Sequence, residues 1–448
     1  MPANALNRPL ACIILAAGLG TRMKSDLPKP LHKIAGRPMI DHIVALAESL
    51  APEKIVIVTG PGMGAINKRH PCVIQDRPLG TAHALMATRD EMKGFTGDVL
   101  VLYGDSPLVT RETLVQMREK LHKEADIAVV VTGFRQQTPN RYGRLVFDAN
   151  GYLERIVEHV DATEQERALP LLNGGYYALR GDGLFDRLAC IDNDNAKGEY
   201  YLTDLIGITG KAGLTSVTVE IDALEVMGAN SRADLATLER AMQDRLRAAL
   251  MDQGVTMIAP ETVFLSFDTR IGRDSIIEPF VIFGQDVVVG DGVTIKGHCH
   301  LEGATVEDGA QIGPFARLRP SAKIGANAHI GNFVEVKNAE VGKGAKANHL
   351  TYIGDGVVGE GSNIGAGTIF CNYDGYLKHR TEIGKKVFVG SNCAFVAPVS
   401  VGDDSVVGAG SVITRDVPAD TIAIVRSEQR HIDGAAKKYH ECKAVKKA

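Results

Sequence analysis

The chain has 448 residues, which is too many for one ordinary hydrophobic core, so two or more domains are expected. Its formal net charge of -4 provides no overall basic field that would hold nucleic acid or an anionic membrane. No apolar run approaches the roughly twenty residues needed to cross a bilayer. The seven cysteines contain no C-x-x-C pair, which favours reduced thiols in the cytoplasm.

The first expected element is a buried parallel strand over residues 11–15, because that run is wholly apolar. A glycine-rich turn over residues 16–23 follows at once, and its free backbone N–H groups could face phosphate oxygens. Arg22 adds positive charge to the turn, and Lys29 stands close enough in sequence to reach the same phosphates. The dinucleotide fingerprint G-x-G-x-x-G is absent because Met23 replaces its third glycine, and the turn does not match a Walker loop.

Alternating helix and strand patterns continue with a helix over residues 41–50 and strands over residues 55–59 and 98–102, which predicts an α/β domain. Asp105 closely follows the third strand, at the end of a parallel strand where open α/β sheets bind ligands. Mg²⁺ prefers a few carboxylate oxygens together with substrate phosphates, so Asp105 and one more oxygen donor would suffice. A strand-end cap remains the alternative interpretation of Asp105.

A helix with one apolar face is predicted over residues 231–251, starting from an N-cap at Ser231 with Asp234 three residues later. The run is too short to favour a coiled coil. We therefore expect a domain over residues 1–230, a linker helix over 231–251 and a second domain over 252–448.

From Ile271 to Pro418 an aliphatic or aromatic residue recurs every sixth position, a period that matches neither a helix nor an isolated strand. This period predicts a parallel β-helix, in which three hexapeptides form one triangular coil. The period does not fix the hand of the coil. The inward positions are Ile271, Ile277, Phe283, Val289, Ile295, Leu301, Ile312, Leu318, Ile324, Ile330, Val336, Ile383, Val389, Phe395, Val401, Val407 and Ile413.

The repeat is interrupted between Leu301 and Ile312 and over residues 370–381, and we expect loops that carry function at both places. Two cations, Arg319 and Lys337, lie off the inward positions and precede His349. An imidazole is suited to accepting a proton near neutral pH, so His349 is a candidate general base. Surface charge and a structural histidine are the alternative interpretations.

The N-terminal string L-A-A-G-x-G-T-R-M followed by L-P-K-P-L resembles the signature of sugar-nucleotide pyrophosphorylases. Later strings at residues 142–144, 156–159, 172–174, 198–204 and 228–230 follow the order seen in N-acetylglucosamine-1-phosphate uridylyltransferases. The resemblance implies Lys29 and Arg22 as catalytic residues, and Mg²⁺ on Asp105 and Asn230. It also implies uracil contacts at Gln75, Gly80 and Thr81, sugar contacts at Gly143, Glu158 and Asn173, and further substrate contacts at Leu15, Ala16, Ala17, Gly18, Tyr103 and Gly104.

The repeat region resembles hexapeptide-repeat acyltransferases, whose coils are left-handed and which tend to trimerise. Strings at residues 347–355, 363–367 and 371–375 closely match glucosamine-1-phosphate N-acetyltransferase domains. The match implies that His349 is the general base, that Arg319 and Lys337 hold the sugar phosphate, and that Tyr352 and Asn363 contact the sugar. The acetyl-coenzyme A groove would be lined by Ala366, Asn372, Tyr373, Ser391, Ala409 and Arg426.

Both halves together resemble bacterial bifunctional enzymes of UDP-N-acetylglucosamine synthesis. Such an enzyme acetylates glucosamine 1-phosphate from acetyl-CoA, then joins N-acetylglucosamine 1-phosphate to UTP with Mg²⁺ and releases pyrophosphate. The resemblance implies a cytoplasmic homotrimer with no nucleic-acid or membrane partner. A single-activity sugar-1-phosphate nucleotidyltransferase is one alternative, and a non-catalytic relative of the translation exchange-factor subunits is another.

Two positions depart from the family pattern. Leu19 stands where lysine is common, and Gly174 follows Asn173 where threonine is common. Neither change removes a predicted metal ligand or Lys29, so we expect altered affinity at most.

Overall fold

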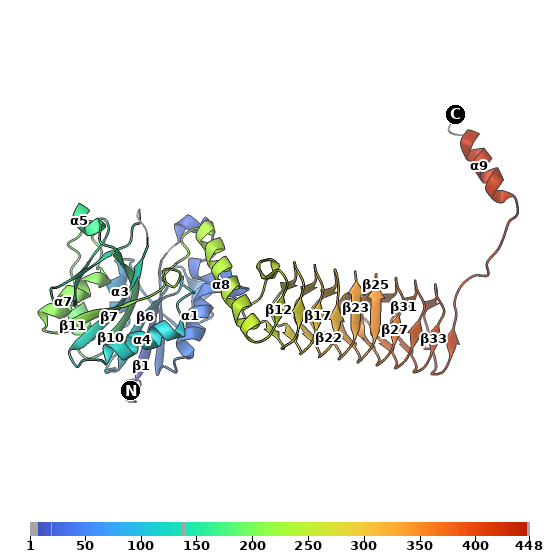
Figure 1. Ribbon diagram of the computed structural model, residues 1–448, viewed down its shortest axis with the longest axis horizontal. Helices are drawn as coiled ribbons and strands as arrows, with labels where there is room; N and C mark the ends of the chain where they lie inside the picture. Colours follow the sequence, from blue (N-terminus) through green and yellow to red (C-terminus); the bar gives the residue numbers. More distant parts are fainter. Residues whose placement is uncertain (1–7, 19, 137–139, 446–448) are drawn as a thin grey trace. The chain divides into compact units, whose positions relative to one another are not determined.

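The computed structural model describes residues 8–18, 20–136 and 140–445. The chain divides into two compact units, the first ending at Arg245 and the second beginning at Leu246. The first is an α/β unit and the second is a column of short parallel strands (Figure 1). Both expected architectures, the α/β domain and the parallel β-helix, are confirmed. None of the helices within the described ranges is long and apolar enough to span a membrane.

The first unit is built on a nine-stranded mixed sheet with the order β11-β7-β10-β6-β1-β4-β5, to which β8 and β9 are attached beside β10. Strands β4, β1 and β6 are parallel neighbours, whereas β10 runs antiparallel between β6 and β7. The strands are β1 (Leu10–Leu15), β4 (Lys54–Thr59), β5 (Cys72–Ile74), β6 (Asp98–Tyr103), β7 (Ile127–Arg135), β8 (Arg144–Phe147), β9 (Leu153–Val157), β10 (Leu171–Arg180) and β11 (Thr215–Glu220), with a small hairpin β2 (Lys33–Ile34) and β3 (Arg37–Pro38).

Helices cover both faces of this sheet, so every residue of β1 is buried. Alternate β1 side chains enter two different hydrophobic clusters, one packed against α1 and α4 and the other against α3, α6 and α7. The helices are α1 (Met39–Glu48), α2 (Gly64–Asn67), α3 (Thr81–Met86), α4 (Arg111–Leu121), α5 (Glu164–Arg167), α6 (Leu184–Leu188) and α7 (Leu205–Lys211), and the 3-10 turns are Thr21–Met23, Lys29–Leu31 and Leu202–Asp204.

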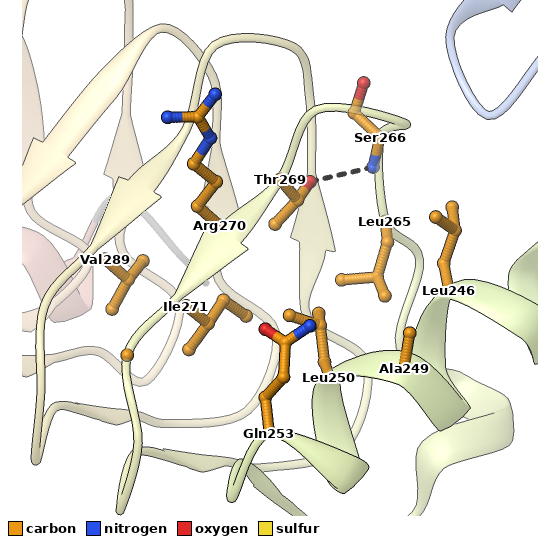
Figure 2. Close-up of a pocket in the computed structure, with 11 residues that line it drawn as sticks. Leu246, Ala249, Leu250, Gln253, Leu265, Ser266, Thr269, Arg270, Ile271 and Val289 are labelled. Carbon is orange, nitrogen blue, oxygen red and sulfur yellow. Dashed lines mark hydrogen bonds between the residues drawn. The ribbon is translucent and has the colours of Figure 1, made fainter. Parts of the chain in front are cut away.

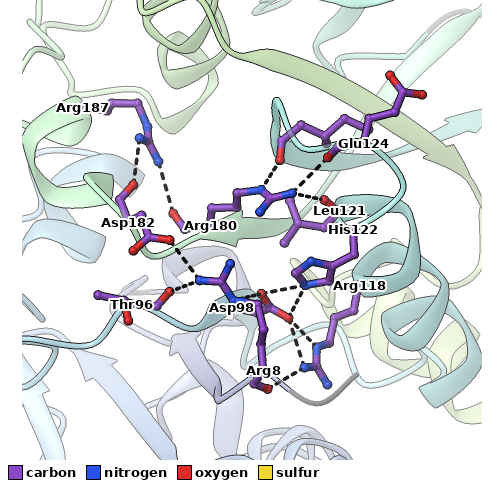
Figure 3. Close-up of polar contacts among 11 residues, drawn as sticks. Arg8, Thr96, Asp98, Arg118, Leu121, His122, Glu124, Arg180, Asp182 and Arg187 are labelled. Carbon is purple, nitrogen blue, oxygen red and sulfur yellow. Dashed lines mark hydrogen bonds and ion pairs between the residues drawn. The ribbon is translucent and has the colours of Figure 1, made fainter. Parts of the chain in front are cut away.

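A buried carboxylate at the first residue of β6 ties the start of the described chain to the sheet (Figure 3). Asp98 accepts hydrogen bonds from Arg118 at 3.1 Å and from His122 at 2.9 Å. Arg8 donates to the Thr96 carbonyl at 2.6 Å. Because Asp98 is fully buried, the guanidinium groups of Arg118 and Arg8 compensate a charge that would otherwise be costly to desolvate.

Helix α8 (Arg232–Asp252) begins at the predicted cap. The Asp234 amide donates to Ser231 Oγ at 3.2 Å, while Asp234 Oδ2 accepts from the Ser231 amide at 2.8 Å. These bonds satisfy backbone groups that a helix N-terminus leaves without partners. The division between the two compact units falls inside this helix, after Arg245.

The second unit stacks parallel strands into three columns, and each strand pairs with the equivalent strand of the next coil. The first column is β12 (Thr256–Met257), β14 (Ile276–Ile277), β17 (Thr294–Ile295), β20 (Gln311–Ile312), β23 (His329–Asn332), β25 (Lys346–His349), β27 (Asn363–Ile364), β30 (Phe388–Val389), β33 (Val406–Val407) and β35 (Ile422–Ala423).

The other two columns share the long strands β24 (Glu335–Val341) and β26 (Tyr352–Val358). One contains β13 (Arg270–Ile271), β16 (Val288–Val289), β19 (Ala304–Val306), β22 (Ala322–Ile324), β29 (Thr381–Ile383) and β32 (Val399–Val401). The other contains β15 (Ile282–Phe283), β18 (His300–Leu301), β21 (Arg317–Leu318), β28 (Ile369–Cys371), β31 (Ala394–Val396) and β34 (Val412–Ile413). A 3-10 turn (Pro260–Thr262) lies between β12 and β13, and helix α9 (Ala435–Val445) follows the last strand of the column.

All the predicted inward residues are buried in one continuous core. The expectation of a loop between Leu301 and Ile312 is wrong, because β19 fills this interval and Val306 is buried in the same core. The coil there is one residue shorter, with steps of five and six. The expected loop after β28 is present, since residues 372–380 separate β28 from β29.

An apolar cavity of about 500 Å³ lies between the last turns of α8 and the first coils (Figure 2). Leu246, Leu250, Leu265, Ile271 and Val289 contribute its aliphatic lining. None of the predicted site residues lies there, so the cavity belongs to the packing of the helix end on the first coil.

Truncating one inward side chain should selectively weaken the β-helix. Ile330→Ala removes a fully buried side chain and leaves a cavity, so we expect a loss of about 2–5 kcal/mol in the free energy of unfolding. Gln311→Ala, an exposed position on the neighbouring strand, is the control and should change it by no more than about 0.5 kcal/mol. Denaturant unfolding followed by circular dichroism, with hydrogen exchange to locate the change in β23 and β25, tests this; equal effects of the two variants would contradict it.

Candidate active sites

The glycine-rich turn after β1 lies directly against Lys29. Gly20 has a left-handed backbone (φ 63°), and a Cβ atom on it would approach Lys29 Cβ to 2.7 Å. Only glycine therefore allows both this conformation and this close approach. The turn and the following lysine form one unit, as the sequence predicts for a phosphate-binding loop.

Four predicted residues from distant parts of the chain converge at this lysine. Lys29 forms an ion pair with Asp105, and its Nζ lies 3.2 Å from Asn230 Oδ1. Arg22 donates to the same Asn230 oxygen at 3.0 Å. Asn230 is held in turn by its backbone N–H, which donates to Asp234 at the start of α8 (3.0 Å).

These residues fit a divalent cation. One carboxylate oxygen of Asp105 and the amide oxygen of Asn230 already contact a single cation, the Lys29 ammonium. Oxygen donors of this kind are those that Mg²⁺ prefers, with phosphates and water completing its shell. Among the described residues no group of three or more His, Cys, Asp or Glu side chains is placed to hold a metal. The protein would therefore supply only part of the coordination.

A cavity of about 410 Å³ opens beside this cluster, and most of the predicted substrate residues line it. Its walls come from the ends of β1 and β6, the turn before α3 and the segment after β9. The predicted residues in the lining are Leu15, Ala16, Ala17, Gly18, Lys29, Gln75, Gly80, Thr81, Tyr103, Asp105 and Glu158.

Gly80 lies in the tight turn that leads into α3. It precedes α3 with a positive φ of 115°, and a Cβ atom on it would come within 2.5 Å of the Tyr200 carbonyl oxygen. Gln75 is buried and donates to the Gly80 carbonyl at 3.1 Å. The turn therefore starts a helix and also faces the cavity.

Three further residues predicted to contact substrate, Gly104, Gly143 and Asn173, are not among the residues that line the cavity. Gly104 follows β6 directly, and Gly143 accepts a hydrogen bond from the Asn173 amide at 2.9 Å. A Cβ atom on Gly174 would lie 2.5 Å from Thr132 Oγ1, so this chain has no room for the threonine common there. Leu19 lies outside the described residues.

Besides Pro30, Pro78 and Ala84, the cavity wall contains three polar residues that the sequence did not predict, namely Lys197, Glu199 and Tyr201. Glu199 and Tyr201 belong to the string over residues 198–204, and Lys197 directly precedes it. This string contributed to the family resemblance, but no role was predicted for its residues. Their position on an irregular segment between α6 and α7 gave no periodic signal that could have placed them.

Glu158 is a partly buried carboxyl group among charged neighbours. Burial raises its pKa, and the nearby carboxylates Asp161, Asp204 and Glu199 raise it further, whereas Lys197 lowers it. A carboxylate in this environment is well placed to accept hydrogen bonds from sugar hydroxyls, which would compensate its desolvation.

In the second unit, His349 ends β25 on the exposed surface of one corner of the column. Its Nδ1 atom lies 2.6 Å from Oδ1 of Asn332, the residue directly below it on β23. The Gly367 amide of the next coil donates to the His349 carbonyl at 3.4 Å. The corner backbone is therefore fixed on both sides.

The predicted phosphate ligands form a cluster of cations. Arg319 pairs with Glu335 at 2.8 Å. The pKa of the half-buried Lys337 is lowered chiefly by Lys378, and also by Arg319. Lys378, in the loop after β28, was not predicted. A bound phosphate would relieve the repulsion among these three cations.

Asp355 on β26 organises the predicted acetyl-coenzyme A residues of the loop after β28. It accepts hydrogen bonds from Asn372 and, at 2.6 Å, from Asn338. Asn372 also lies 3.4 Å from the Tyr352 hydroxyl, which links the loop to a predicted sugar contact. Tyr373 bends back over the loop and donates to the Gly375 carbonyl at 2.5 Å.

Small residues continue the corner above His349. The Asn392 amide donates to Ala366 at 2.7 Å, and the Gly410 amide donates to Ser391 at 2.8 Å. Arg426 reaches the Ala409 carbonyl at 3.1 Å. These contacts align the predicted coenzyme residues as one column, while Asn363 begins the strand β27 on the adjoining face.

The corner changes character at the histidine. Residues with positive φ repeat along it; they are bulky up to and including the coil of His349, whereas in the later coils they are small. The bulky set is Phe280, His298, Phe315, Phe333 and Leu350, of which the first four stack ring on ring at 4.8–5.2 Å; the small set is Gly367, Asn392 and Gly410. The corner in the coils after His349 therefore carries less side-chain bulk than the corner in the coils before it.

Comparison with known proteins agrees with this division. Residues 12–196 match the MobA-like NTP transferase domain. Residues 268–303 and 303–338 match the bacterial transferase hexapeptide (six repeats), and residues 380–415 match the hexapeptide repeat of succinyl-transferase. The chain is thus a nucleotidyltransferase domain followed by a hexapeptide-repeat transferase domain.

Relatives that match nearly the whole chain identify its family more specifically than the domain matches do. The chain is 52% identical over 442 residues to the bifunctional protein GlmU of Paramagnetospirillum magneticum, covering 98% of each chain. It is 51% and 50% identical over 448 residues to those of Novosphingobium aromaticivorans and Maricaulis maris, covering 99% of each chain. The chain belongs to the bifunctional GlmU family. This membership confirms the two expected activities, a uridylyltransferase and an acetyltransferase of UDP-N-acetylglucosamine synthesis.

The environment of Glu158 predicts a measurable pH dependence. Because burial raises its pKa above the ordinary 4.5, the group takes up a proton on folding between that value and its folded pKa. The stability of the wild type relative to Glu158→Gln should therefore decrease as pH rises through the folded pKa. Carbon-13 NMR of the carboxyl group should show the raised pKa directly, and Lys197→Gln should raise it further. A titration at or below pH 4.5 would contradict this account.

Proposed function

We propose that the second unit acetylates glucosamine 1-phosphate from acetyl-CoA, and that the first unit then joins the product to UTP and releases pyrophosphate. The observation that best supports the first-unit assignment is the convergence of Lys29, Arg22, Asp105 and Asn230 beside one cavity. The second-unit assignment is supported by a histidine at the point where an exposed corner changes from bulky to small residues.

In uridylyl transfer the sugar phosphate attacks the α-phosphorus of UTP, and the protein chiefly positions groups and neutralises charge. The backbone N–H groups of the glycine-rich turn, with Lys29 and Arg22, would hold the triphosphate. Asp105 and Asn230 would hold Mg²⁺, which when bound neutralises phosphate charge. Gln75, Gly80 and Thr81 would contact the uracil ring, and Gly143, Glu158 and Asn173 the sugar.

In acetyl transfer the exposed His349 would take the proton of the attacking amine. Arg319, Lys337 and Lys378 would hold the sugar phosphate, with Tyr352 and Asn363 on the sugar. Acetyl-CoA would follow the corner of Ala366, Ser391 and Ala409 toward Arg426, with Asn372 and Tyr373 on the loop beside it. The mutual repulsion of the cations supports an anionic ligand at that place.

We further propose that the protein is a homotrimer in the cytoplasm. All seven cysteines, which fall within the described residues, are free thiols, as expected in a reducing compartment. The ladder of exposed aromatic residues below His349 is an apolar surface of the kind that subunit contacts cover.

The two activities should be separable by mutation. His349→Ala should lower acetyl transfer by about 10²–10⁴-fold, because it removes the general base, and should leave uridylyl transfer unchanged. Release of coenzyme A and release of pyrophosphate, measured on the same preparation, provide the test and its internal control. Full acetyl transfer by the variant would remove His349 from its assigned role. A wild-type chain that released pyrophosphate but no coenzyme A would favour the single-activity alternative.

Uridylyl transfer should require the metal ligand pair, whereas acetyl transfer should not. Asp105→Asn removes the one negatively charged ligand, so it should raise the Mg²⁺ concentration needed for half-maximal pyrophosphate release by at least about tenfold. Chelation by EDTA should stop pyrophosphate release and leave coenzyme A release intact. An unchanged Mg²⁺ requirement in Asp105→Asn would place the metal elsewhere.

A further inference from the structure

The catalytic histidine proposed above has a side-chain partner with no assigned role. Asn332 Oδ1 lies 2.6 Å from His349 Nδ1, which is a short, well-formed hydrogen bond. Within the described residues, Asn332 is the one side chain that hydrogen-bonds this ring. The titratable and charged side chains on the strands around it are His329 on β23 and Lys346 on β25, and no carboxylate bonds to the ring.

The fold makes this contact unavoidable. Asn332 and His349 are paired residues of the parallel strands β23 and β25, and the Leu350 amide donates to the Asn332 carbonyl at 3.0 Å. The two strands approach closely because Gly331 has no side chain. A Cβ atom on it would come within 1.9 Å of the Asn348 carbonyl oxygen. The pairing of the two strands therefore fixes Asn332 directly below the imidazole of His349.

We propose that Asn332 is a positioning residue that selects the catalytic tautomer of His349. A neutral imidazole carries one N–H and one lone pair, and a carbonyl oxygen can only accept a hydrogen bond. With the amide oxygen of Asn332 facing Nδ1, the ring holds its hydrogen on Nδ1. The lone pair is then on Nε2, the nitrogen that remains to receive a proton. This inference rests on the proposed role of His349 as the base.

The assignment gives a balanced reaction. The free amine of glucosamine 1-phosphate attacks the thioester carbon, a C–N bond forms, and the amine proton passes to Nε2. The tetrahedral intermediate then loses the sulfur through cleavage of the C–S bond, and Nε2 returns the proton to the departing thiolate. Throughout, the Nδ1–H group donates to Asn332, so the transient imidazolium keeps a partner for its second N–H.

Two variants separate positioning from simple structural support. Asn332→Ala removes the hydrogen-bond acceptor and frees the imidazole ring to rotate. The kcat for acetyl transfer should therefore fall about 10- to 100-fold, which is a part of the about 10²–10⁴-fold that a general base contributes to the rate. KM for both substrates should change by less than about twofold. Asn332→Asp retains an acceptor at the same place and should restore most of the rate. Gln311→Ala, an exposed amide of the preceding coil, is the matched control and should retain full activity.

A spectroscopic measurement reads the tautomer directly in the unaltered protein. Nitrogen-15 NMR of the full-length chain with labelled histidine, assigned by the signal lost in His349→Ala, should show the Nδ1–H form. In Asn332→Ala the signals should shift toward a mixture of both forms. Pyrophosphate release by every variant confirms that the first unit is intact.

The outcomes distinguish the two proposals. If His349→Ala retains acetyl transfer, the proposed base is wrong and this inference fails with it. If His349→Ala is inactive but Asn332→Ala keeps its kcat, or wild-type His349 carries its hydrogen on Nε2, only the role of Asn332 is overturned. Loss of rate in Asn332→Ala with rescue by Asn332→Asp supports it.

Discussion

Each coil of the β-helix is held on the preceding one by backbone hydrogen bonds and by one inward aliphatic side chain per strand. This stacking fixes which residues of successive coils touch. Asn332, His349 and Ala366 are each 17 residues apart and lie one above another along the same corner. The second site is therefore a consequence of coil length, and a rigid column holds it without any need for a mobile loop around the histidine.

The first site depends on a different constraint, the meeting of strand ends in an open sheet. The turn after β1, the end of β6 and the start of α8 bring Lys29, Asp105 and Asn230 together although some 200 residues separate the first from the last. The ammonium of Lys29 neutralises these oxygens here. If phosphates attracted the lysine, the same oxygens would become available to a divalent cation, and charge neutralisation would then couple metal binding to nucleotide binding.

The sequence predicted those elements that leave a repeating or a local pattern of residues. The hexapeptide period placed all the residues that it listed in the core but missed others such as Val306, and the Ser231–Asp234 cap located the start of α8. The five-residue step at Val306 was misread as a loop, because a missing residue interrupts the period without interrupting the coil. Lys197, Lys378 and Asn332 were missed because their roles arise from contacts between irregular or stacked segments. Such contacts depend on how segments far apart in the sequence are aligned in space, and a short sequence motif does not contain that information.

The central claim is that one corner of the column aligns the thioester, the amine and His349. A crystal structure of the full-length chain with coenzyme A and glucosamine 1-phosphate tests it most directly. The account predicts the coenzyme along Ala366, Ser391 and Ala409, with its sulfur and the sugar amine both facing Nε2 of His349. A coenzyme bound along another edge, or an amine facing Nδ1 instead, would contradict it.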